Sequence, residues 1–190
     1  AMAAVKEAGI RLAVIDRPNF INAHDIEGNL VKNAQLSFVG AYPLPNRHGF
    51  TMAEIVNYVK DTLGVSLDLE VVKMPSYERM RYFDELGLCY VSPSPNMPSV
   101  NAAVVYPGAC LIEGTNLSEG RGTCTPFELI GAPYLDAERF KAELDAFNFP
   151  GVKLRAATFK PMFQKHAGKV CQGVFVHVTD RAKFKPLRFF

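Results

Sequence analysis

Residues 10–19, IRLAVIDRPN, decide the fold class of this chain. The first six residues are mostly apolar, which is typical of a buried parallel strand in an α/β sheet. The strand ends in Asp16, Arg17, Pro18 and Asn19, and ligands of open α/β sheets bind at the carboxyl ends of strands. The polar ending therefore predicts a binding site. A loop fixed by an internal Asp–Arg ion pair is an equally good interpretation.

Predicted helices and strands alternate on both sides of this stretch. We expect a helix to end over residues 1–8, closed by Gly9, and a long polar passage over 20–37 that suits a flap. Thr51 and Glu54 predict a capping box. The other predicted elements are strands over 67–71, 152–159 and 170–178, and helices over 51–63, 76–86, 99–106 and 136–147, with a further helix starting at Thr125. This mixed order predicts an α/β or α+β fold.

The most polar segment is residues 110–127, CLIEGTNLSEGRGTCTPF. Its glycines allow tight backbone turns, and scaffolds carry binding and catalytic groups on such loops. Glu113 and Glu119 lie six positions apart, and a glycine-rich loop can bring them close together. Two carboxyl groups facing one bond are the requirement for glycoside hydrolysis. Arg121 is placed to hold an anionic group or to pair with Glu119. A solvated turn that only carries charge is the competing interpretation.

Two other segments carry candidate side chains. Arg47 and His48 precede the helix that Thr51 opens, where the helix dipole favours anions. A histidine there is either a hydrogen-bonded structural partner or a catalyst. Ser94 and Asn96 stand in a loop stiffened by three prolines, which suits either a preorganised sugar site or a rigid connector.

Composition narrows the function classes. The chain has 190 residues, 48% of them hydrophobic, and a net charge of +2, which is too small to indicate nucleic-acid binding. No apolar run is long enough to span a membrane, and no signal peptide is visible. The cysteines and histidines lack metal-ligand spacing, so we predict no metal and no cofactor. Cys110 and Cys124 are either free thiols or, in an oxidising compartment, a disulfide. We expect Lys165 and His166 to be solvated.

A set of short motifs, in register over nearly the whole chain, resembles bacterial NamZ-like exo-β-N-acetylmuramidases. The motifs are DRPN, SFVG, RHGFT, PSPNMP, YPG, LIEGTNLSEGRGT, PFE and GAP. The resemblance implies a glycoside hydrolase that releases N-acetylmuramic acid from the non-reducing end of peptidoglycan-derived glycans. It also implies export to the periplasm or the cell exterior.

The resemblance further implies a Rossmann-like domain joined to a smaller auxiliary domain, with the active site between them. It assigns residues 1–45 to the end of the first domain and 46–190 to the second. The family's Pro-Glu-His-Gly-Phe stretch, whose glutamate is a leading catalytic candidate, is not among these residues. We therefore expect the chain to be the C-terminal part of the family's length, to contact the missing N-terminal domain and to supply part of the site. Phe20 after DRPN, Asn46 and Tyr77 depart from the family pattern.

Roles follow from the same resemblance. The catalytic candidates are Glu119, Glu113 and His48. The substrate-binding candidates are Asp16, Arg17, Asn19, Arg47, Ser94, Asn96, Asn116, Ser118 and Arg121. The arginines would hold the lactyl carboxylate of the sugar, and all of these groups are expected to converge on one concave wall. The alternative is a non-catalytic module that binds cell-wall glycans. A nucleotide-handling enzyme is disfavoured because no phosphate-binding glycine loop is present.

Overall fold

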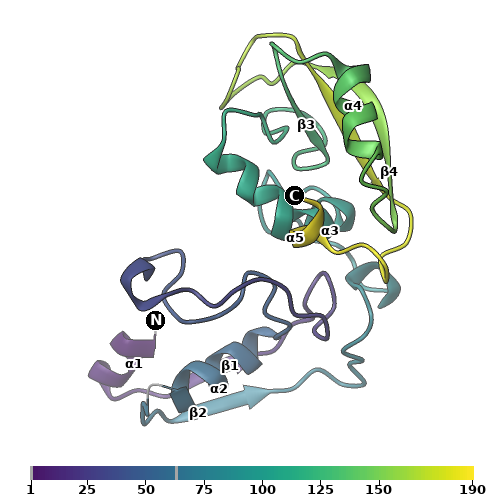
Figure 1. The fold of residues 1–190 in the computed structure, drawn as a ribbon. Helices are drawn as coiled ribbons and strands as arrows, with labels where there is room; N and C mark the ends of the chain where they lie inside the picture. The colour runs from purple at the N-terminus through teal and green to yellow at the C-terminus, as the bar shows by residue number, and fades with distance from the viewer. Residues whose placement is uncertain (1, 63) are drawn as a thin grey trace. The chain divides into compact units, whose positions relative to one another are not determined.

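The computed structural model describes residues 2–62 and 64–190, which pack into two compact units. The N-terminal unit comprises Ala1–Leu88 and the C-terminal unit comprises Cys89–Phe190. Both contain helices and strands, so the predicted mixed α/β class is confirmed (Figure 1). The N-terminal unit includes residues on both sides of position 45, and the predicted domain boundary there stays a prediction.

The N-terminal unit is built on a two-stranded parallel sheet. Strand β1 (Leu12–Ile15) pairs with β2 (Leu69–Val72), which confirms the predicted parallel strand. Burial alternates along both strands. This confirms the half-buried strand predicted for β2, whereas the prediction that β1 is buried on both faces is wrong. Helix α1 (Met2–Ala8) ends at Gly9, whose φ is +62°. Residues 1 and 63, which the predicted helices include, lie outside the described residues.

Local hydrogen bonds form one predicted helix of this unit and prevent another. Thr51 and Glu54 exchange the capping-box bonds that open α2 (Met52–Thr62), as predicted. The predicted helix over 76–86 is wrong, because only the 3-10 turn η2 (Phe83–Glu85) forms there. Ser76 has a φ of +54°, which a right-handed helix excludes. The polar passage over 20–37 is irregular as expected, apart from the 3-10 turn η1 (Asn33–Gln35).

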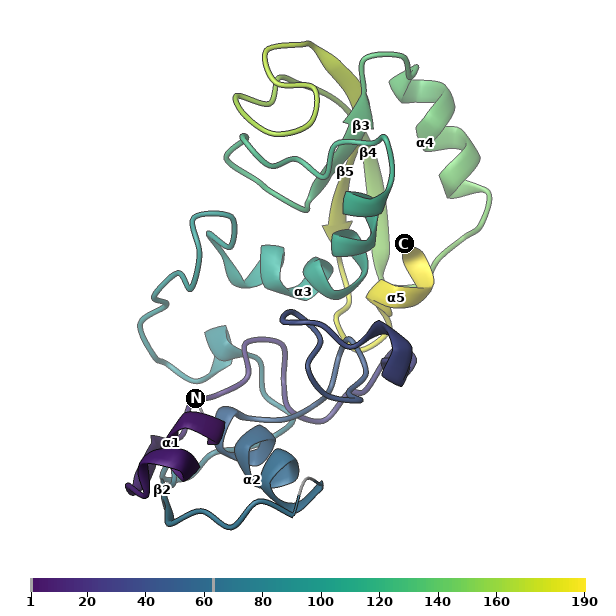
Figure 2. The same cartoon turned by 90° about the vertical axis from the view of Figure 1, so that its left-hand side faces the viewer.

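The C-terminal unit contains a three-stranded antiparallel sheet in the order β3-β5-β4. The strands are β3 (Leu129–Ala132), β4 (Val152–Phe159) and β5 (Cys171–Val178). The helices are α3 (Val100–Ala109), η3 (Cys110–Gly114), α4 (Ala137–Asp145) and α5 (Pro186–Phe189). Helix α4 lies alongside the sheet (Figure 2). Its predicted N-cap is confirmed, since Asp136 accepts a hydrogen bond from the Arg139 amide at 2.8 Å.

Two predicted helix boundaries in this unit are wrong. Helix α3 continues through Pro107 to Ala109, since a proline in a helix removes one hydrogen bond without ending it here. No helix starts at Thr125. Phe127 has a φ of +68° and donates its amide to the Glu119 carbonyl at 2.6 Å, and β3 begins two residues later.

Gly173 explains how closely β3 and β5 pack. A Cβ atom on Gly173 would lie 1.9 Å from the Ile130 carbonyl oxygen, so any side chain there would push the strands apart. This close packing holds β3 against β5, and Gly131 of β3 forms a bridge with Ser118 in the polar loop. The sheet therefore anchors the loop.

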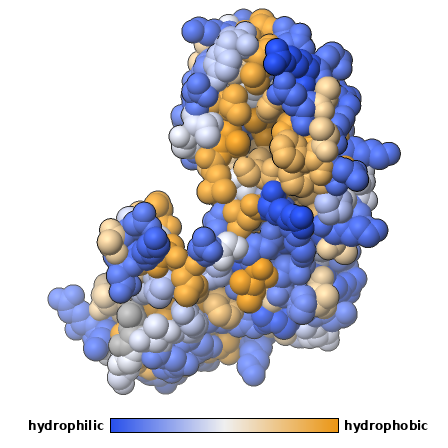
Figure 3. All heavy atoms as spheres, viewed as in Figure 1, coloured by the Kyte–Doolittle hydropathy of each residue, from blue (hydrophilic) through white to orange (hydrophobic). Residues whose placement is uncertain are grey.

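Apolar side chains remain at the surface of the N-terminal unit. Phe38 and Val39 are almost fully exposed, and Ile15 and Val72 of the small sheet are about half exposed or more. Figure 3 shows apolar atoms at the surface of both units. A sheet of two strands is marginal on its own, and Ile15 and Val72 are side chains that it leaves uncovered. Among the described residues, no helix is both long and apolar enough to cross a membrane.

Candidate functional site

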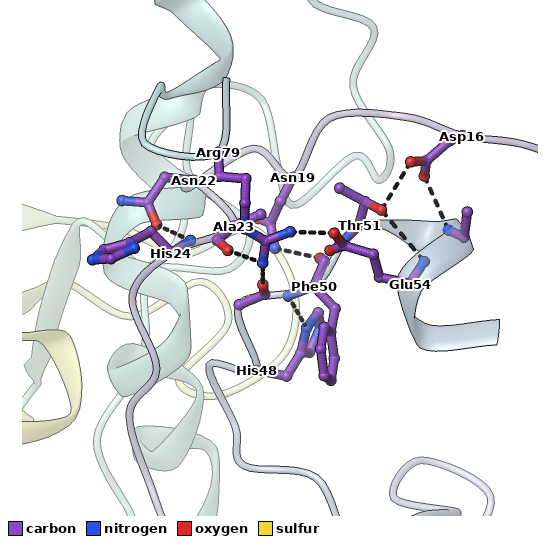
Figure 4. A network of polar contacts seen from close by, with 12 residues as sticks. Asp16, Asn19, Asn22, Ala23, His24, His48, Phe50, Thr51, Glu54 and Arg79 are labelled. Carbon is purple, nitrogen blue, oxygen red and sulfur yellow. Dashed lines mark hydrogen bonds and ion pairs between the residues drawn. The ribbon is translucent and has the colours of Figure 1, made fainter. Parts of the chain in front are cut away.

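Asp16 joins the end of β1 to the start of α2. Its carboxylate accepts hydrogen bonds from the Ala53 amide and the Thr51 hydroxyl, each at 2.9 Å (Figure 4). It also accepts one from the Arg17 amide at 2.9 Å. A carboxylate at a helix N-terminus is stabilised by the helix dipole. The predicted binding residue Asp16 therefore has its acceptors engaged within the fold.

Asn19 and Arg79 hold the turn that carries His48. Asn19 donates to the Phe50 carbonyl at 3.0 Å and accepts from the Ile21 amide. Arg79 donates to the Gly49 carbonyl at 2.9 Å and also pairs with Glu54 (Figure 4). Sequence reasoning missed Arg79, because it lies in a segment predicted to be a packing helix and its partners are distant in the chain.

His48 is half-buried and has a defined tautomer. Its Nδ1 accepts a hydrogen bond from the Phe50 amide at 3.0 Å, so the proton of the neutral ring lies on Nε2. The ring stacks against Phe50 with centroids 6.0 Å apart. Burial lowers the pKa of His48. The geometry thus supplies a neutral imidazole whose Nε2–H can donate to a ligand.

The lowered pKa of His48 predicts that stability depends on pH. The unfolded chain binds the proton more readily, so the contribution is complete above pH about 6.5 and is lost as the pH falls through the lower folded pKa. We expect the free energy of unfolding, measured in urea, to fall by no more than about 1.4 kcal/mol per pH unit over this range. His48→Phe should remove it, whereas the control His24→Gln, at an exposed position, should keep it. If the free energy of unfolding depends on pH equally in the wild type and in His48→Phe, His48 is not the cause of the pH dependence.

Arg47 and Arg17 lie in very different environments. Arg47 is 4% exposed and pairs with Glu27 at 2.6 Å and Asp25 at 3.1 Å. It also donates to the Ile21 carbonyl at 2.7 Å. Arg17 is exposed, and its guanidinium has no ion-pair partner among the described residues. Of the two predicted anion-binding residues, Arg17 is available to a ligand and Arg47 holds the fold.

The proline-rich loop of the C-terminal unit presents one open amide. Ser94 accepts a hydrogen bond from the Asn96 backbone at 3.2 Å, and its carbonyl accepts from Met97. These bonds shape a turn. The side chain of Asn96 has no hydrogen-bond partner within residues 89–190 and is half-buried. The Asn96 side-chain amide is therefore open to a ligand, and Ser94 shapes the turn that carries it.

Arg121 brings both predicted carboxylates to one guanidinium. Its Nη2 lies 2.6 Å from Glu113 and its Nε lies 3.3 Å from Glu119. The guanidinium also stacks over the ring of Phe127, 4.9 Å from its centroid. The glycine-rich loop thus folds these carboxylates together, as expected. Glu113 is 42% exposed and is accessible to a ligand.

Glu119 is buried, with only 3% of its side chain exposed. Its Oε2 lies 3.1 Å from the Lys165 ammonium. That oxygen accepts no hydrogen bond from any described residue, because the ammonium is directed at backbone carbonyls. The expectation that Lys165 and His166 are solvated is wrong. The β4–β5 connection folds back onto the polar loop, with the Met162 amide donating to the Gly122 carbonyl at 3.0 Å.

Asn116 and Ser118 differ in accessibility. Ser118 is buried and accepts from the Gly120 amide at 3.2 Å, so it shapes the loop. Asn116 is exposed, and its carbonyl accepts from His166 Nε2 at 2.8 Å and from the Tyr134 hydroxyl at 3.3 Å. These bonds fix the backbone and leave the Asn116 side-chain amide open.

Glu128 is a second buried carboxyl that sequence reasoning missed as a candidate. Burial raises the pKa of Glu128. The only signal for it was its place in the PFE motif. All four cysteines are free, so the disulfide between Cys110 and Cys124 is not formed. Among the described residues, no group of three or more His, Cys, Asp or Glu side chains is arranged to hold a metal ion.

The predicted residues thus fall into two sets. The N-terminal unit carries Asp16, Arg17, Asn19, Arg47 and His48. The C-terminal unit carries Ser94, Asn96, Glu113, Asn116, Ser118, Glu119 and Arg121. Each set is ordered within its own unit, and the convergence of the two on one wall stays a prediction.

Comparisons with solved structures support the fold. A DUF1343 family protein from Bacteroides fragilis NCTC 9343 matches with a TM-score of 0.94 and 31% identity, over 100% of this chain and 50% of that one. A second DUF1343 family protein from the same organism matches with a TM-score of 0.69 and 26% identity, over 99% of this chain and 48% of that one.

Sequence comparisons extend over nearly the whole chain. Peptidoglycan beta-N-acetylmuramidase NamZ of Bacillus subtilis (strain 168) is 47% identical over 188 residues, which is 99% of this chain and 45% of that protein. This chain therefore spans about half the length of the relatives it matches. The family described as exo-beta-N-acetylmuramidase NamZ, N-terminal, matches residues 1–101, and its C-terminal counterpart matches residues 104–189. The match is thus not confined to the family's C-terminal domain, and the chain belongs to the exo-β-N-acetylmuramidase NamZ family.

Proposed function

We propose that this protein is an exo-β-N-acetylmuramidase, a glycoside hydrolase that releases N-acetylmuramic acid from the non-reducing end of peptidoglycan fragments. The observation that carries the proposal is the Glu113–Arg121–Glu119 cluster in a chain of this family. An accessible carboxylate beside a guanidinium suits an acidic sugar. The relative from Bacillus subtilis is named a peptidoglycan beta-N-acetylmuramidase, which supports the proposal.

We infer from their contacts that some candidates are free to touch the sugar and that the others position them. Glu113 would act as acid or base, because it is exposed and oriented by Arg121. Arg121 has an Nη1 without a partner in the described residues, which would hold the lactyl carboxylate. The other ligand-facing candidates are Arg17, His48, Asn96 and Asn116. The positioning residues are Asp16, Asn19, Arg47, Ser94, Ser118 and Glu119.

This chain would supply only part of the site. Its relatives are about twice as long, and the small parallel sheet leaves Ile15 and Val72 exposed. Parallel sheets are normally covered on both faces. We therefore propose that the rest of a family-length protein adds strands to this sheet, as a Rossmann-like domain would, and contributes a further catalytic carboxyl.

The test is release of free N-acetylmuramic acid from a peptide-free disaccharide that carries it at the non-reducing end. We expect the complete protein to release the sugar. We expect the 190-residue chain alone to bind it without turnover, because its site is incomplete. Binding without turnover by the complete protein would instead support a cell-wall glycan-binding module. Release by the chain alone would show that no further carboxyl is needed.

We also propose that the protein acts outside the cytoplasmic membrane, because peptidoglycan lies there. Cell fractionation is the check. The protein should appear in the periplasmic or secreted fraction, and a strictly cytoplasmic distribution would contradict the proposal.

A further inference from the structure

Side chains of the connection between β4 and β5 form hydrogen bonds with backbone carbonyls of the polar loop. Lys165 donates to the carbonyls of Ile112 at 2.8 Å, Leu117 at 2.8 Å and Thr115 at 3.1 Å. His166 adds a bond to the carbonyl of Asn116 at 2.8 Å. These residues lie about fifty positions from their partners in the chain. The connection therefore fixes the loop segment that carries Glu113.

Lys165 has more oxygen partners than it has hydrogens. Its ammonium carries three N–H groups, and three carbonyls take them. Glu119 Oε2 lies 3.1 Å away and is buried, with no hydrogen bond within residues 2–62 and 64–190. Lys165 thus compensates the charge of Glu119 without donating to it. A buried carboxylate is costly unless a nearby cation compensates it.

Glu119 in turn orients Arg121. Its Oε1 lies 3.3 Å from Arg121 Nε, and Arg121 Nη2 lies 2.6 Å from Glu113. The four side chains form an alternating row of charges: Glu113, Arg121, Glu119 and Lys165. Without Lys165, Arg121 would be the only cation paired with Glu119 among the residues that the structure describes. It would then be drawn toward Glu119 and away from Glu113.

We propose that Lys165 is a positioning residue of the active site, which compensates the buried charge of Glu119 and thereby keeps Arg121 on Glu113. This role rests on the proposed glycosidase function. The competing explanation is that Lys165 only fastens the loop through the three carbonyls. The two explanations differ in whether Lys165 and Glu119 are energetically coupled.

Thermal unfolding of the 190-residue chain measures that coupling. We expect Lys165→Met to lower the melting temperature by about 5–10 °C. Glu119→Gln should lower it in the wild-type background and raise it by about 3 °C or more in the Lys165→Met background, because it removes the uncompensated charge. Lys169→Met, at an exposed lysine of the same connection, should leave it unchanged. If Glu119→Gln lowers the melting temperature in both backgrounds, Lys165 only fastens the loop and the proposal is wrong.

Turnover by the complete protein is the second readout. Lys165→Met should reduce kcat for sugar release by about tenfold or more, as expected when a catalytic group is displaced. Lys169→Met should leave kcat unchanged. An unchanged kcat in Lys165→Met would overturn the positioning role even if the coupling is found. If the wild-type complete protein releases no sugar, the proposed function fails, and the unfolding experiment alone decides whether Lys165 compensates Glu119.

Discussion

Arg47→Met is expected to destabilise the N-terminal unit by about 3–5 kcal/mol, the cost of removing one partner from a buried ion pair. Arg47 is 4% exposed, and its guanidinium lies between Glu27 and Asp25, which are themselves mostly buried. Methionine fills the volume but leaves both carboxylates without their cation. The donor to the Ile21 carbonyl is lost as well. Urea unfolding, followed by a probe within residues 2–62, measures the change.

Arg17→Met is the matched control, because it removes the same charge from an exposed position. Surface substitutions of this kind usually change stability by less than about 0.5 kcal/mol. If Arg17 binds the lactyl carboxylate, the same variant should weaken binding of N-acetylmuramic acid while the fold persists. A loss of under about 1 kcal/mol in Arg47→Met would contradict the structural role given to Arg47.

The contrast between Arg17 and Arg47 could not be predicted from the sequence. Both stand in short polar segments, residues 16–19 and 46–48, and both are predicted to bind anions. Nothing local distinguishes them, because the partners of Arg47 lie about twenty positions away in a passage without periodicity. Burial of a charged side chain depends on tertiary packing, which residue spacing does not reveal.

Local chemistry was predicted well and long-range chemistry was not. The caps at Thr51 and Asp136 depend on residues three positions away, so the sequence alone predicts them. The false helix start at Thr125 has the same local signal. There the backbone is governed instead by the bond from Phe127 to Glu119 and by pairing of β3 with β5. Tertiary bonds overrode a weak local preference.

The same distinction holds within the candidate site. The glycine-rich loop predicted that Glu113, Glu119 and Arg121 come together, since they lie within nine residues of one another. The burial of Glu119 could not be predicted, because it depends on Lys165 from a distant connection. The sequence thus identifies which carboxylates gather, and the structure distinguishes the accessible one from the buried one.

Glu113→Gln is expected to lower kcat for N-acetylmuramic acid release by the complete protein about 10²-fold or more. A positioned acid or base typically contributes about 10²–10⁴-fold, and the amide can neither donate nor accept the proton in the same way. Binding should change little, because the glutamine keeps the size of the side chain and a carbonyl oxygen for Arg121. A fall in kcat with an almost constant KM is therefore the expected result.

The control for this variant is Glu143→Gln. Glu143 is also an exposed glutamate paired with an arginine, Arg139, at 2.9 Å, but it lies on the surface of α4. Neutralising Glu143 removes an equal charge and a similar ion pair, so the kcat of the Glu143→Gln variant should match that of the wild type. A loss of less than about tenfold in Glu113→Gln would remove Glu113 from the chemistry, since general catalysis supplies more than that. The acid and base would then both have to come from elsewhere, and Glu113 would be only the partner that holds Arg121 in place.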